Sequence, residues 1–248
     1  MSYSNIKKKI LIFIPAYNVE KKIYSVIERI PKSIFQNNDI KILIINDYSK
    51  DKTFEEISKA TTNFDYTFEV YNSTVNLGYG GVQKYAFQYA IDNEYDYAIM
   101  VHGDNQYNPK YIKDMLTISF KNPNVAAVVG SRMAKKLNAL KGNMPLYKFI
   151  GNIVLTKFFN IFYSSNFTDC HTGYWAYNLN KIKKQFFVKA DNGFCFDIDM
   201  RLMLTKDKAT IRELPIDTYY GTERSSMHIT YAVRFFLRVL KYKLFNSL

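Results

Sequence analysis

The sequence predicts an α/β fold in which a doubly wound, mostly parallel sheet is flanked by helices and followed by a C-terminal amphipathic helix. Two observations lead to this fold class. Short apolar runs alternate with segments of helical apolar spacing through the first 130 residues. Several of these runs end in polar loops, and ligands of open parallel sheets bind beyond the carboxyl ends of the strands.

Five apolar runs are expected to be buried strands, because they are too short for helices and are bounded by polar residues. They span residues 10–14, 40–45, 67–71, 97–101 and 125–129. Helices are expected between and after them, at 19–30, 52–59, 82–92 and 109–120. Further along we expect 169–176 to return to the sheet, a helix at 196–204 and a strand at 210–215.

Residues 134–163 differ in character from the predicted strands and helices on either side of them. Residues 134–145 are polar and contain Gly, Asn and Lys, which predicts a mobile loop. Residues 146–163 are strongly apolar and aromatic and are expected to form a helix. Because Lys148 and Lys157 interrupt it, we expect it to lie on a membrane surface or to cover the domain rather than to span a bilayer.

The C-terminal segment divides the chain into a main domain, 1–226, and a basic amphipathic helix, 227–248. Arg234, Arg238 and Lys241 share one helical stripe, and apolar residues form another. This pattern predicts a helix that lies on an anionic bilayer. The alternative is an ordinary surface helix that packs on the core.

Composition narrows the partners. The formal charge is +12, which indicates an anionic partner. No zinc-finger, zinc-knuckle or aromatic RNA-binding signature is present, so nucleic acid is not expected. Cys170 and Cys195 are too few for a disulfide framework and lack metal-ligand spacing. With no secretory leader pattern and no uncharged apolar run of about 18 residues, we expect a cytoplasmic protein, peripheral on the inner face of the membrane.

Acidic and glycine-rich loops follow the predicted strands. Asp51 can cap the helix that begins at 52, whereas Asp47 is too early to do so and is expected to be free for a ligand. Gly78 and Gly80 precede a helix and would let backbone approach a phosphate, although such a loop can also be only a turn. The same two alternatives apply to Asp104, which follows the strand at 97–101.

Seven segments together resemble one family: the family 2 glycosyltransferases with the GT-A fold, in particular the dolichol-phosphate mannosyltransferase-like, polyprenyl-phosphate glycosyltransferase branch. In chain order the segments are PAYNVE (15–20), NDYSKDKT (46–53), NLGYG (76–80), HGDNQ (102–106), GSR (130–132), DCHTGY (169–174) and FDID (196–199). The resemblance spans residues 10 to 226 and implies inverting, metal-dependent transfer from a UDP- or GDP-sugar. The acceptor it implies is a polyprenyl phosphate or a cell-envelope glycan.

The resemblance also implies roles for individual residues. Pro15, Tyr17, Glu20 and Asp47 match positions that hold the nucleoside. Two further residues, Asp104 and Gln106, match the metal-diphosphate site, where Mg²⁺ or Mn²⁺ would take oxygen ligands and neutralise the departing nucleoside diphosphate.

Two departures qualify the resemblance. His102 stands where the family often has a first aspartate; its imidazole suits Mn²⁺ better than Mg²⁺, or it hydrogen-bonds nearby backbone instead. Trp175 stands where many relatives carry arginine, so the acceptor is held otherwise or is not the same lipid phosphate. A non-catalytic, membrane-bound partner subunit is therefore a rival interpretation. A second rival is a sugar-phosphate nucleotidyltransferase, which usually shows a glycine-rich, Arg-Lys-containing loop where this chain has residues 15–18.

The acceptor decides whether a general base is needed. A hydroxyl acceptor requires one, and the candidates are Asp169, Asp197 and Asp199. Of these, Asp199 matches an acidic family position, but a carboxylate at a helix start is also an ordinary dipole partner. A lipid phosphate is already ionised and needs no base; Arg132 and Arg224 would then orient it, unless they pair with surface carboxylates.

Overall fold

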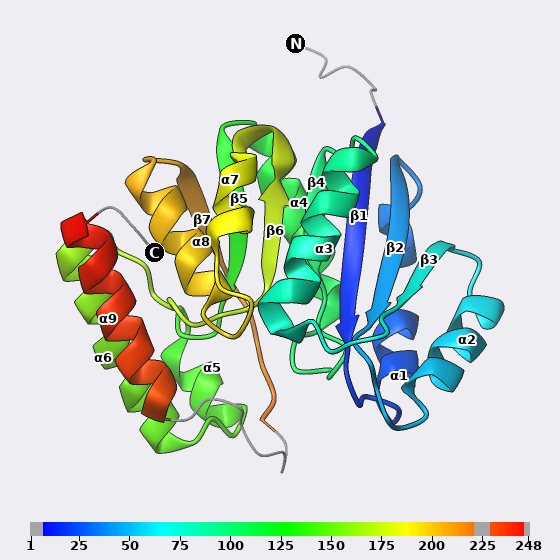
Figure 1. Cartoon of the computed structure of the whole chain (residues 1–248), viewed down its shortest axis with the longest axis horizontal. Helices are drawn as coiled ribbons and strands as arrows, with labels where there is room; N and C mark the ends of the chain where they lie inside the picture. The colour runs from blue at the N-terminus through cyan, green and yellow to red at the C-terminus, as the bar shows by residue number, and fades with distance from the viewer. Residues whose placement is uncertain (1–6, 221–228, 246–248) are drawn as a thin grey trace.

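A computed structural model of the protein describes residues 7–220 and 229–245 (Figure 1). Within these residues, seven strands form one sheet in the order β3-β2-β1-β4-β6-β5-β7. The strands are β1 (Lys8–Ala16), β2 (Asn38–Asn46), β3 (Thr67–Asn72), β4 (Tyr97–Met100), β5 (Val125–Ser131), β6 (Trp175–Asn178) and β7 (Thr210–Pro215). Among the strands of the described ranges, β6 alone runs antiparallel to its neighbours, so the predicted mostly parallel sheet is confirmed.

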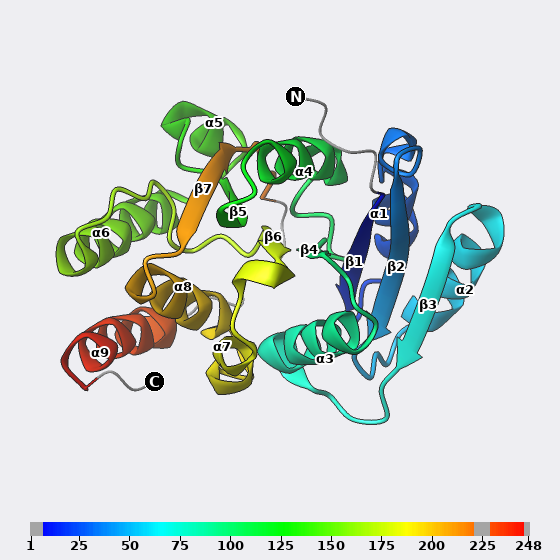
Figure 2. The ribbon, with the colours of Figure 1, turned by 90° about the horizontal axis from the view of Figure 1, so that it is seen from above.

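Helices cover both faces of the sheet. They are α1 (Ile23–Glu28), α2 (Thr53–Asn63), α3 (Gly78–Asp92), α4 (Ile112–Lys121), α5 (Lys136–Lys141), α6 (Leu146–Tyr163), α7 (Lys184–Lys189), α8 (Phe196–Lys206) and α9 (Ile229–Phe245). Alternate residues of β1 face opposite ways: Ile10 and Ile12 pack toward α1, α2 and α4, whereas Leu11 and Phe13 pack toward α3. Figure 2 shows α1 and α4 on one side of the sheet and α3 and α7 on the other. This is the doubly wound arrangement.

Beyond the β7 edge, α6 and α9 lie side by side (Figures 1 and 2). Phe235 and Val239 of α9 are fully buried in a cluster with residues of α6 and α8. The rings of Phe158 and Phe236 meet at 4.6 Å between centroids. The inner face of α9 therefore packs on the core, as the alternative for this helix proposed. The proposed domain boundary after residue 226 lies outside the described residues.

Several segments differ from the sequence prediction, among them the helix expected at 82–92, which begins at Gly78 as α3. The segment 134–145 contains the short helix α5, held by a 2.9 Å bond from Asn138 to Asp217. The helix expected over 19–30 is confined to Ile23–Glu28, because the backbone N–H of Val19 bonds to Thr53 (2.8 Å) in the neighbouring loop. The sheet strand expected at 169–176 is formed only from Trp175 onward.

Within the described residues, no helix combines the length and the apolar character that crossing a bilayer requires.

Candidate active site

The loops that follow β1 and β2 are joined into one surface at the carboxyl edge of the sheet. Asp47 donates its backbone N–H to the carbonyl of Ala16 (2.8 Å), and Glu20 accepts a bond from the backbone of Lys52 (2.9 Å). Tyr17 is 52% exposed on the first loop. The structure thus brings together the residues expected to hold a nucleoside, from two adjacent strand ends.

Asp47 differs from its prediction in one respect. Its side chain is buried, and its two oxygens accept bonds from the backbone N–H groups of Leu77 (2.6 Å) and Gly78 (3.1 Å). The carboxylate therefore caps the N-terminus of α3, where the helix dipole favours negative charge. It is not free, and any ligand it holds must use the remaining lone pairs of the same oxygens.

The glycine-rich loop also differs from its prediction. The N–H groups of Gly80 and Gly81 donate to the carbonyl of Asn192, at 2.8 and 3.1 Å. A Cβ at Gly80 would lie 2.1 Å from the carbonyl oxygen of Asp191. Gly78 has a φ of 76°, which explains glycine there. Together with the Asp47 cap, these bonds occupy the donors expected to face a phosphate, so the glycines permit close packing of the chain on itself.

Asp104 sits in a tight turn after β4. Its Oδ1 accepts the backbone N–H of Gln106 (3.0 Å), and Asn105 adopts a left-handed φ of 67°. A Cβ at Gly103 would lie 2.7 Å from the carbonyl oxygen of Pro15. The close approach at Gly103 places this turn against the end of β1, beside the expected nucleoside residues. The turn uses one oxygen of Asp104 and leaves Oδ2 to a ligand.

His102 uses one ring nitrogen within the protein. Its Nε2 lies 3.0 Å from the carbonyl oxygen of Gly173; because a carbonyl only accepts, Nε2 carries the proton. The ring is held edge-on to Tyr107 at 4.7 Å between centroids. Nε2 thus makes the backbone hydrogen bond that was the alternative to metal binding. Nδ1 is the ring nitrogen left for a metal.

We tested whether these residues suit a divalent cation. No group of three or more His, Cys, Asp or Glu side chains within residues 7–220 and 229–245 is arranged to hold a metal ion. Asp104 and the amide oxygen of Gln106 offer oxygen donors, and His102 offers one nitrogen. Mg²⁺ is commonly bound by one or two carboxylates together with substrate phosphates. The donor set therefore fits a cation shared with a diphosphate.

Asp197, a carboxylate at the start of α8, is linked by a chain of close contacts to His102, which precedes the Asp104 turn. Tyr79 donates a 2.6 Å bond to Oδ2 of Asp197, and Gln83 donates to Oδ1 at 3.3 Å. A Cβ at Gly173 would lie 2.5 Å from the Tyr79 hydroxyl and 2.9 Å from His102 Nε2. Burial raises the pKa of Asp197 to about 6, although the Tyr79 bond opposes this rise. Asp197 can therefore accept a proton near neutral pH.

Asp199 is placed differently from Asp197. Its side chain is fully buried, and Oδ2 accepts bonds from Arg238 of α9 (2.5 Å) and from the backbone of Asp191 (2.8 Å). Burial raises the pKa of Asp199 to about 6 against the opposing charge of Arg238. Arg238 also pairs with the Asp191 carboxylate at 2.7 Å. Arg238 therefore faces the protein and does not belong to the bilayer-facing stripe in which we placed it.

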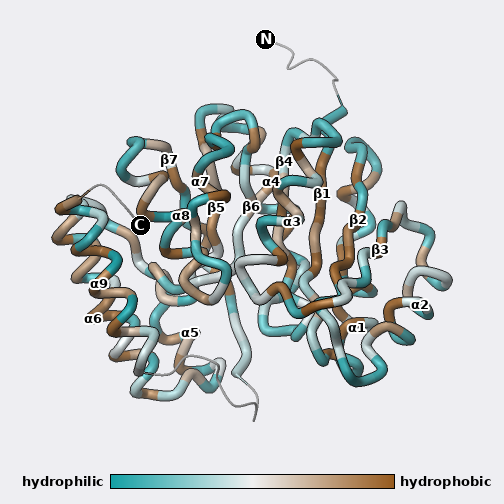
Figure 3. Tube along the Cα trace, viewed as in Figure 1, coloured by the Kyte–Doolittle hydropathy of each residue, from teal (hydrophilic) through white to brown (hydrophobic). Residues whose placement is uncertain are grey.

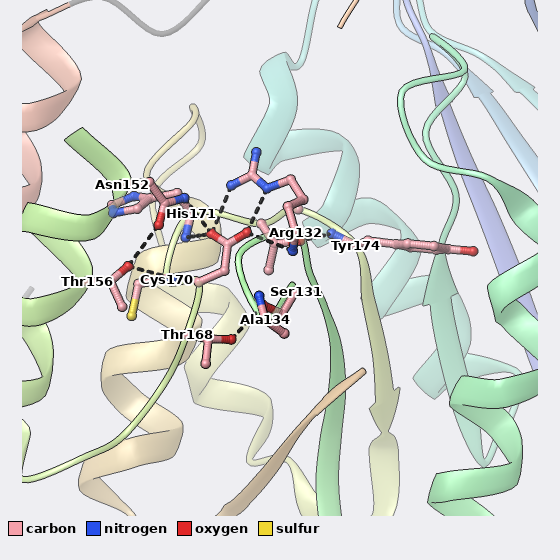
Figure 4. Close-up of polar contacts among 12 residues, drawn as sticks. Ser131, Arg132, Ala134, Asn152, Thr156, Thr168, Cys170, His171 and Tyr174 are labelled. Carbon is pink, nitrogen blue, oxygen red and sulfur yellow. Dashed lines mark hydrogen bonds and ion pairs between the residues drawn. The ribbon is translucent and has the colours of Figure 1, made fainter. Parts of the chain in front are cut away.

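Asp169 and Arg132 form a buried ion pair. Figure 4 shows Arg132 and the polar contacts around this pair. Arg132 Nε and Nη2 donate to the two oxygens of Asp169 at 2.7 and 2.9 Å, and both side chains are buried. Asn152 of α6 adds a 2.8 Å bond to Oδ1. The guanidinium holds the pKa of Asp169 well below its ordinary range despite burial. This argues against Asp169 as a base and assigns most of the Arg132 donors to the protein. Arg224 lies outside the described residues.

Trp175 is a core residue in β6. It is fully buried, and its indole N–H donates to the carbonyl of Thr172 (2.9 Å). The guanidinium of Arg201 lies 4.8 Å from its ring. Arg201, a buried residue of α8, thus packs its guanidinium against the tryptophan that stands where many relatives carry arginine.

Sequence reasoning missed several residues of this site. Tyr79 lies in the first turn of α3, between the two glycines that the sequence singled out, and no local pattern marks its hydroxyl as the partner of Asp197. Asn152 and Tyr220, which hold Asp169 and Arg132, lie in segments that drew notice for other reasons, and nothing near either residue in sequence points to these buried partners. Asp191 follows a short helix at a turn rich in small and polar residues, which marks a loop but not its ion pair.

A mostly parallel sheet, an acidic turn after β4 and a second carboxylate at the start of α8 are the features expected of a glycosyltransferase of the GT-A type. The sequence model described as glycosyl transferase family 2 matches residues 11–186, and the chain belongs to that family. This membership removes the nucleotidyltransferase alternative, and the protein is a glycosyltransferase.

Individual relatives agree with this class. UDP-N-acetylglucosamine--dolichyl-phosphate N-acetylglucosaminyltransferase of Methanococcus voltae is 29% identical over 96% of this chain and 97% of that protein. The low-salt glycan biosynthesis hexosyltransferase Agl6 of Haloferax volcanii is 27% identical over 89% of this chain and 50% of that protein. Glucosyl-3-phosphoglycerate synthase of Mycobacterium tuberculosis, solved with Mn²⁺, uridine diphosphate and glucosyl-3-phosphoglycerate, superposes with a TM-score of 0.63. It covers 95% of this chain and 80% of its own at 12% identity, which shows the shared fold.

Proposed function

We propose that this glycosyltransferase moves a sugar, with inversion, from a UDP- or GDP-sugar to a polyprenyl phosphate or a cell-envelope glycan at an anionic membrane surface. One observation carries the proposal: the segments that contain Asp104 and Asp197, the fourth and the seventh of the sequence motifs, are linked in the structure through Tyr79, His102 and Gly173. The relative from Methanococcus voltae, whose name specifies a dolichyl-phosphate acceptor, supports the lipid acceptor.

In this proposal the nucleoside lies on the joined loops of β1 and β2. Tyr17 supplies an exposed ring, and Pro15 sets the loop beside Gly103. Glu20 and Asp47 keep lone pairs beyond their backbone bonds, so they can accept from ribose hydroxyls or base N–H groups.

We assign the diphosphate and its cation to the Asp104 turn. Asp104 Oδ2, the Gln106 amide oxygen and His102 Nδ1 would hold Mg²⁺ or Mn²⁺. When bound, such a cation neutralises charge on the departing nucleoside diphosphate. The acceptor oxygen attacks the anomeric carbon as the bond to the diphosphate breaks.

The acceptor determines the role of Asp197. For a hydroxyl acceptor, Asp197 is the preferred base, because Asp169 and Asp199 are fully buried and ion-paired. For a lipid phosphate no proton must be removed, and Asp197 would instead repel the acceptor unless it is protonated. Arg132 keeps two N–H hydrogens beyond its bonds to Asp169 and Tyr220, and Arg224 remains the second candidate for binding the phosphate.

A thermal-shift panel tests the donor assignment. UDP and GDP, each with Mn²⁺ or Mg²⁺, should raise the melting temperature because a ligand that binds the folded state alone stabilises it. Asp104→Ala should abolish the metal-dependent part of the shift, whereas the exposed variant Asp65→Ala should keep it. Absence of any shift with all four combinations would overturn the donor class. Release of nucleoside diphosphate from a sugar donor separates an active enzyme from a non-catalytic subunit.

A further inference from the structure

Helix α6 exposes apolar side chains along its whole outer face. Leu146, Tyr147, Ile150, Val154 and Ile161 are each more than half exposed. Their spacing places them on one side of the helix, opposite the buried Leu155 and Phe159. Lys157 is the charged residue on this outer side. A surface helix normally turns polar residues outward, and an apolar outer face of this length marks an interaction site.

Helix α9 extends the same face. Val233, Leu237 and Leu244 are 54%, 61% and 72% exposed, on the side away from Phe235 and Val239. Between the two exposed rows lie the aromatic contacts of the α6–α9 packing, including Phe158 against Phe236. Figure 3 shows apolar colour along both helices. We call the surface formed by Leu146, Tyr147, Ile150, Val154, Ile161, Val233, Leu237 and Leu244 the α6–α9 face.

The charge around this face is of one sign. Residues 133–168 contain five lysines and no acidic residue. Helix α9 adds exposed Arg234, Lys241 and Lys243, again without an acidic residue. An apolar helix face bordered by Lys and Arg matches the interface of an anionic bilayer, which takes apolar side chains below its headgroups and cations at their level. A second copy of this chain would bring two positive rims together.

We propose that the α6–α9 face inserts into the interfacial layer of an anionic bilayer, with α6 contributing as much as the C-terminal helix. The α6–α9 face would bring a lipid-linked acceptor to the site, and in this respect the inference rests on the proposed function. The opposite side of α6 holds the site loop: Asn152 bonds to Asp169 (2.8 Å), and Thr156 accepts the N–H of Cys170 (3.1 Å). One helix thus separates the bilayer from the Arg132–Asp169 pair.

Lys148 marks the point at which an acceptor headgroup would enter. Its Nζ lies 5.3 Å from the ring centre of Tyr220, whose hydroxyl accepts a 2.9 Å bond from Arg132. Lys148 is also beside Tyr147 on the α6–α9 face, 6.0 Å from that ring centre. The docking surface and the candidate acceptor residues are therefore adjacent.

Vesicle flotation of the full chain tests the proposal. Vesicles of phosphatidylcholine with phosphatidylglycerol should carry the protein, and vesicles of phosphatidylcholine alone should carry much less. The double variant Ile150→Glu/Val154→Glu should reduce the bound fraction at least tenfold. The matched control is Val188→Glu on α7, because Val188 is 55% exposed and Val154 is 52% exposed; it should float like the wild type.

The outcomes separate this inference from the proposed function. Equal flotation of the double variant and the wild type would overturn the docking face, even if nucleotide binding is intact. A wild-type dimer that the double variant converts to monomer, without vesicle binding, would assign the face to a second copy and also overturn the proposal. A double variant that fails to float but keeps its nucleoside-diphosphate thermal shift supports the docking face. If the wild type shows no nucleoside-diphosphate thermal shift, the proposed donor class is overturned and the docking face is not affected.

Discussion

Arg132 and Asp169 form a buried, two-pronged ion pair in which Nε and Nη2 donate to separate carboxylate oxygens at 2.7 and 2.9 Å. The backbone N–H of Arg132 adds a third bond to the same carboxylate, at 3.2 Å. The pair therefore fixes the loop that begins at Asp169 to the end of β5. That loop continues to Gly173, whose carbonyl accepts the bond from His102, so the pair also positions the Asp104 side of the site.

Asp169→Asn should lower the free energy of unfolding by about 3–5 kcal/mol, because it leaves a buried guanidinium without its counter-charge. Urea denaturation measures this loss. Asp65→Asn, an exposed carboxylate on the α2–β3 connection, should change stability by less than about 0.5 kcal/mol. A loss below about 1 kcal/mol for Asp169→Asn would show that the pair does not hold the loop.

The Tyr79–Asp197 bond predicts a pH profile that reports the acceptor. With a hydroxyl acceptor, kcat/KM should rise with pH through about 6, where Asp197 loses its proton. Tyr79→Phe should move this rise to higher pH, because the tyrosine bond lowers the pKa of Asp197. The matched control, Tyr24→Phe on α1, should leave the profile in place.

The same profile distinguishes the two acceptor classes. Asp197→Asn should reduce kcat/KM for a hydroxyl acceptor by about 10²–10⁴-fold, the usual contribution of a general base. For a lipid phosphate, which needs no base, the loss should be much smaller. A large, equal loss with both acceptors would mean that Asp197 acts in binding or positioning.

Asp197 also predicts how stability depends on pH. Its pKa is about 6 in the folded protein and near 3.8 when unfolded. Between these values the folded state binds the extra proton, so stability falls as pH rises from about 4 to about 6 and then stays lower. Asp197→Asn removes this contribution. The stability of the variant relative to wild type should therefore be about 2 kcal/mol more favourable at pH 7 than at pH 4, as measured by urea denaturation at both pH values. A constant difference would contradict a raised pKa.

The sequence was sufficient for the sheet and for the positions of the acidic turns, because both depend on local signals. Strand-length apolar runs and helical spacing are read within about ten residues. The partners of buried polar groups are not local. Asp47 was expected to be free because it lies too early to cap the helix that follows it in sequence, yet it caps a helix N-terminus 30 residues further along, at Leu77.

Arg238 shows the same limit for an amphipathic helix. The spacing in α9 placed it with Arg234 and Lys241 on a basic stripe, but helical spacing cannot tell which side of that stripe faces a buried carboxylate. Its partners, Asp191 and Asp199, come from the segment at the start of α8. Arg238 differs from Arg234 and Lys241 because the packing of α9 on α8 brings Arg238 to these carboxylates.

Replacement of Arg238 tests whether α9 is anchored through this ion pair. Arg238→Met should lower the free energy of unfolding by about 3 kcal/mol, because it strands the fully buried Asp199. Arg234→Met changes the same residue type on the same helix at an exposed position and should have little effect on stability. In vesicle flotation the order should reverse, with Arg234→Met weakening binding to anionic vesicles more than Arg238→Met does. If both variants lose stability equally, the loss comes from α9 as a helix and not from the buried pair.

Gly80 predicts that the start of α3 is held by the loop before α8. Alanine there would place its Cβ 2.1 Å from the Asp191 carbonyl oxygen, which is backbone and cannot rotate away. Gly80→Ala should therefore cost about 1–3 kcal/mol, the usual range for overpacking. The control is Gly151→Ala in α6, where nothing lies within 4 Å of the added Cβ and alanine should stabilise the helix by about 0.5–1 kcal/mol. Because Asp47 caps the same helix start, Gly80→Ala should also weaken nucleoside-diphosphate binding in the thermal-shift assay. Full binding with lost stability would show that the α3 terminus and the nucleoside loops move independently.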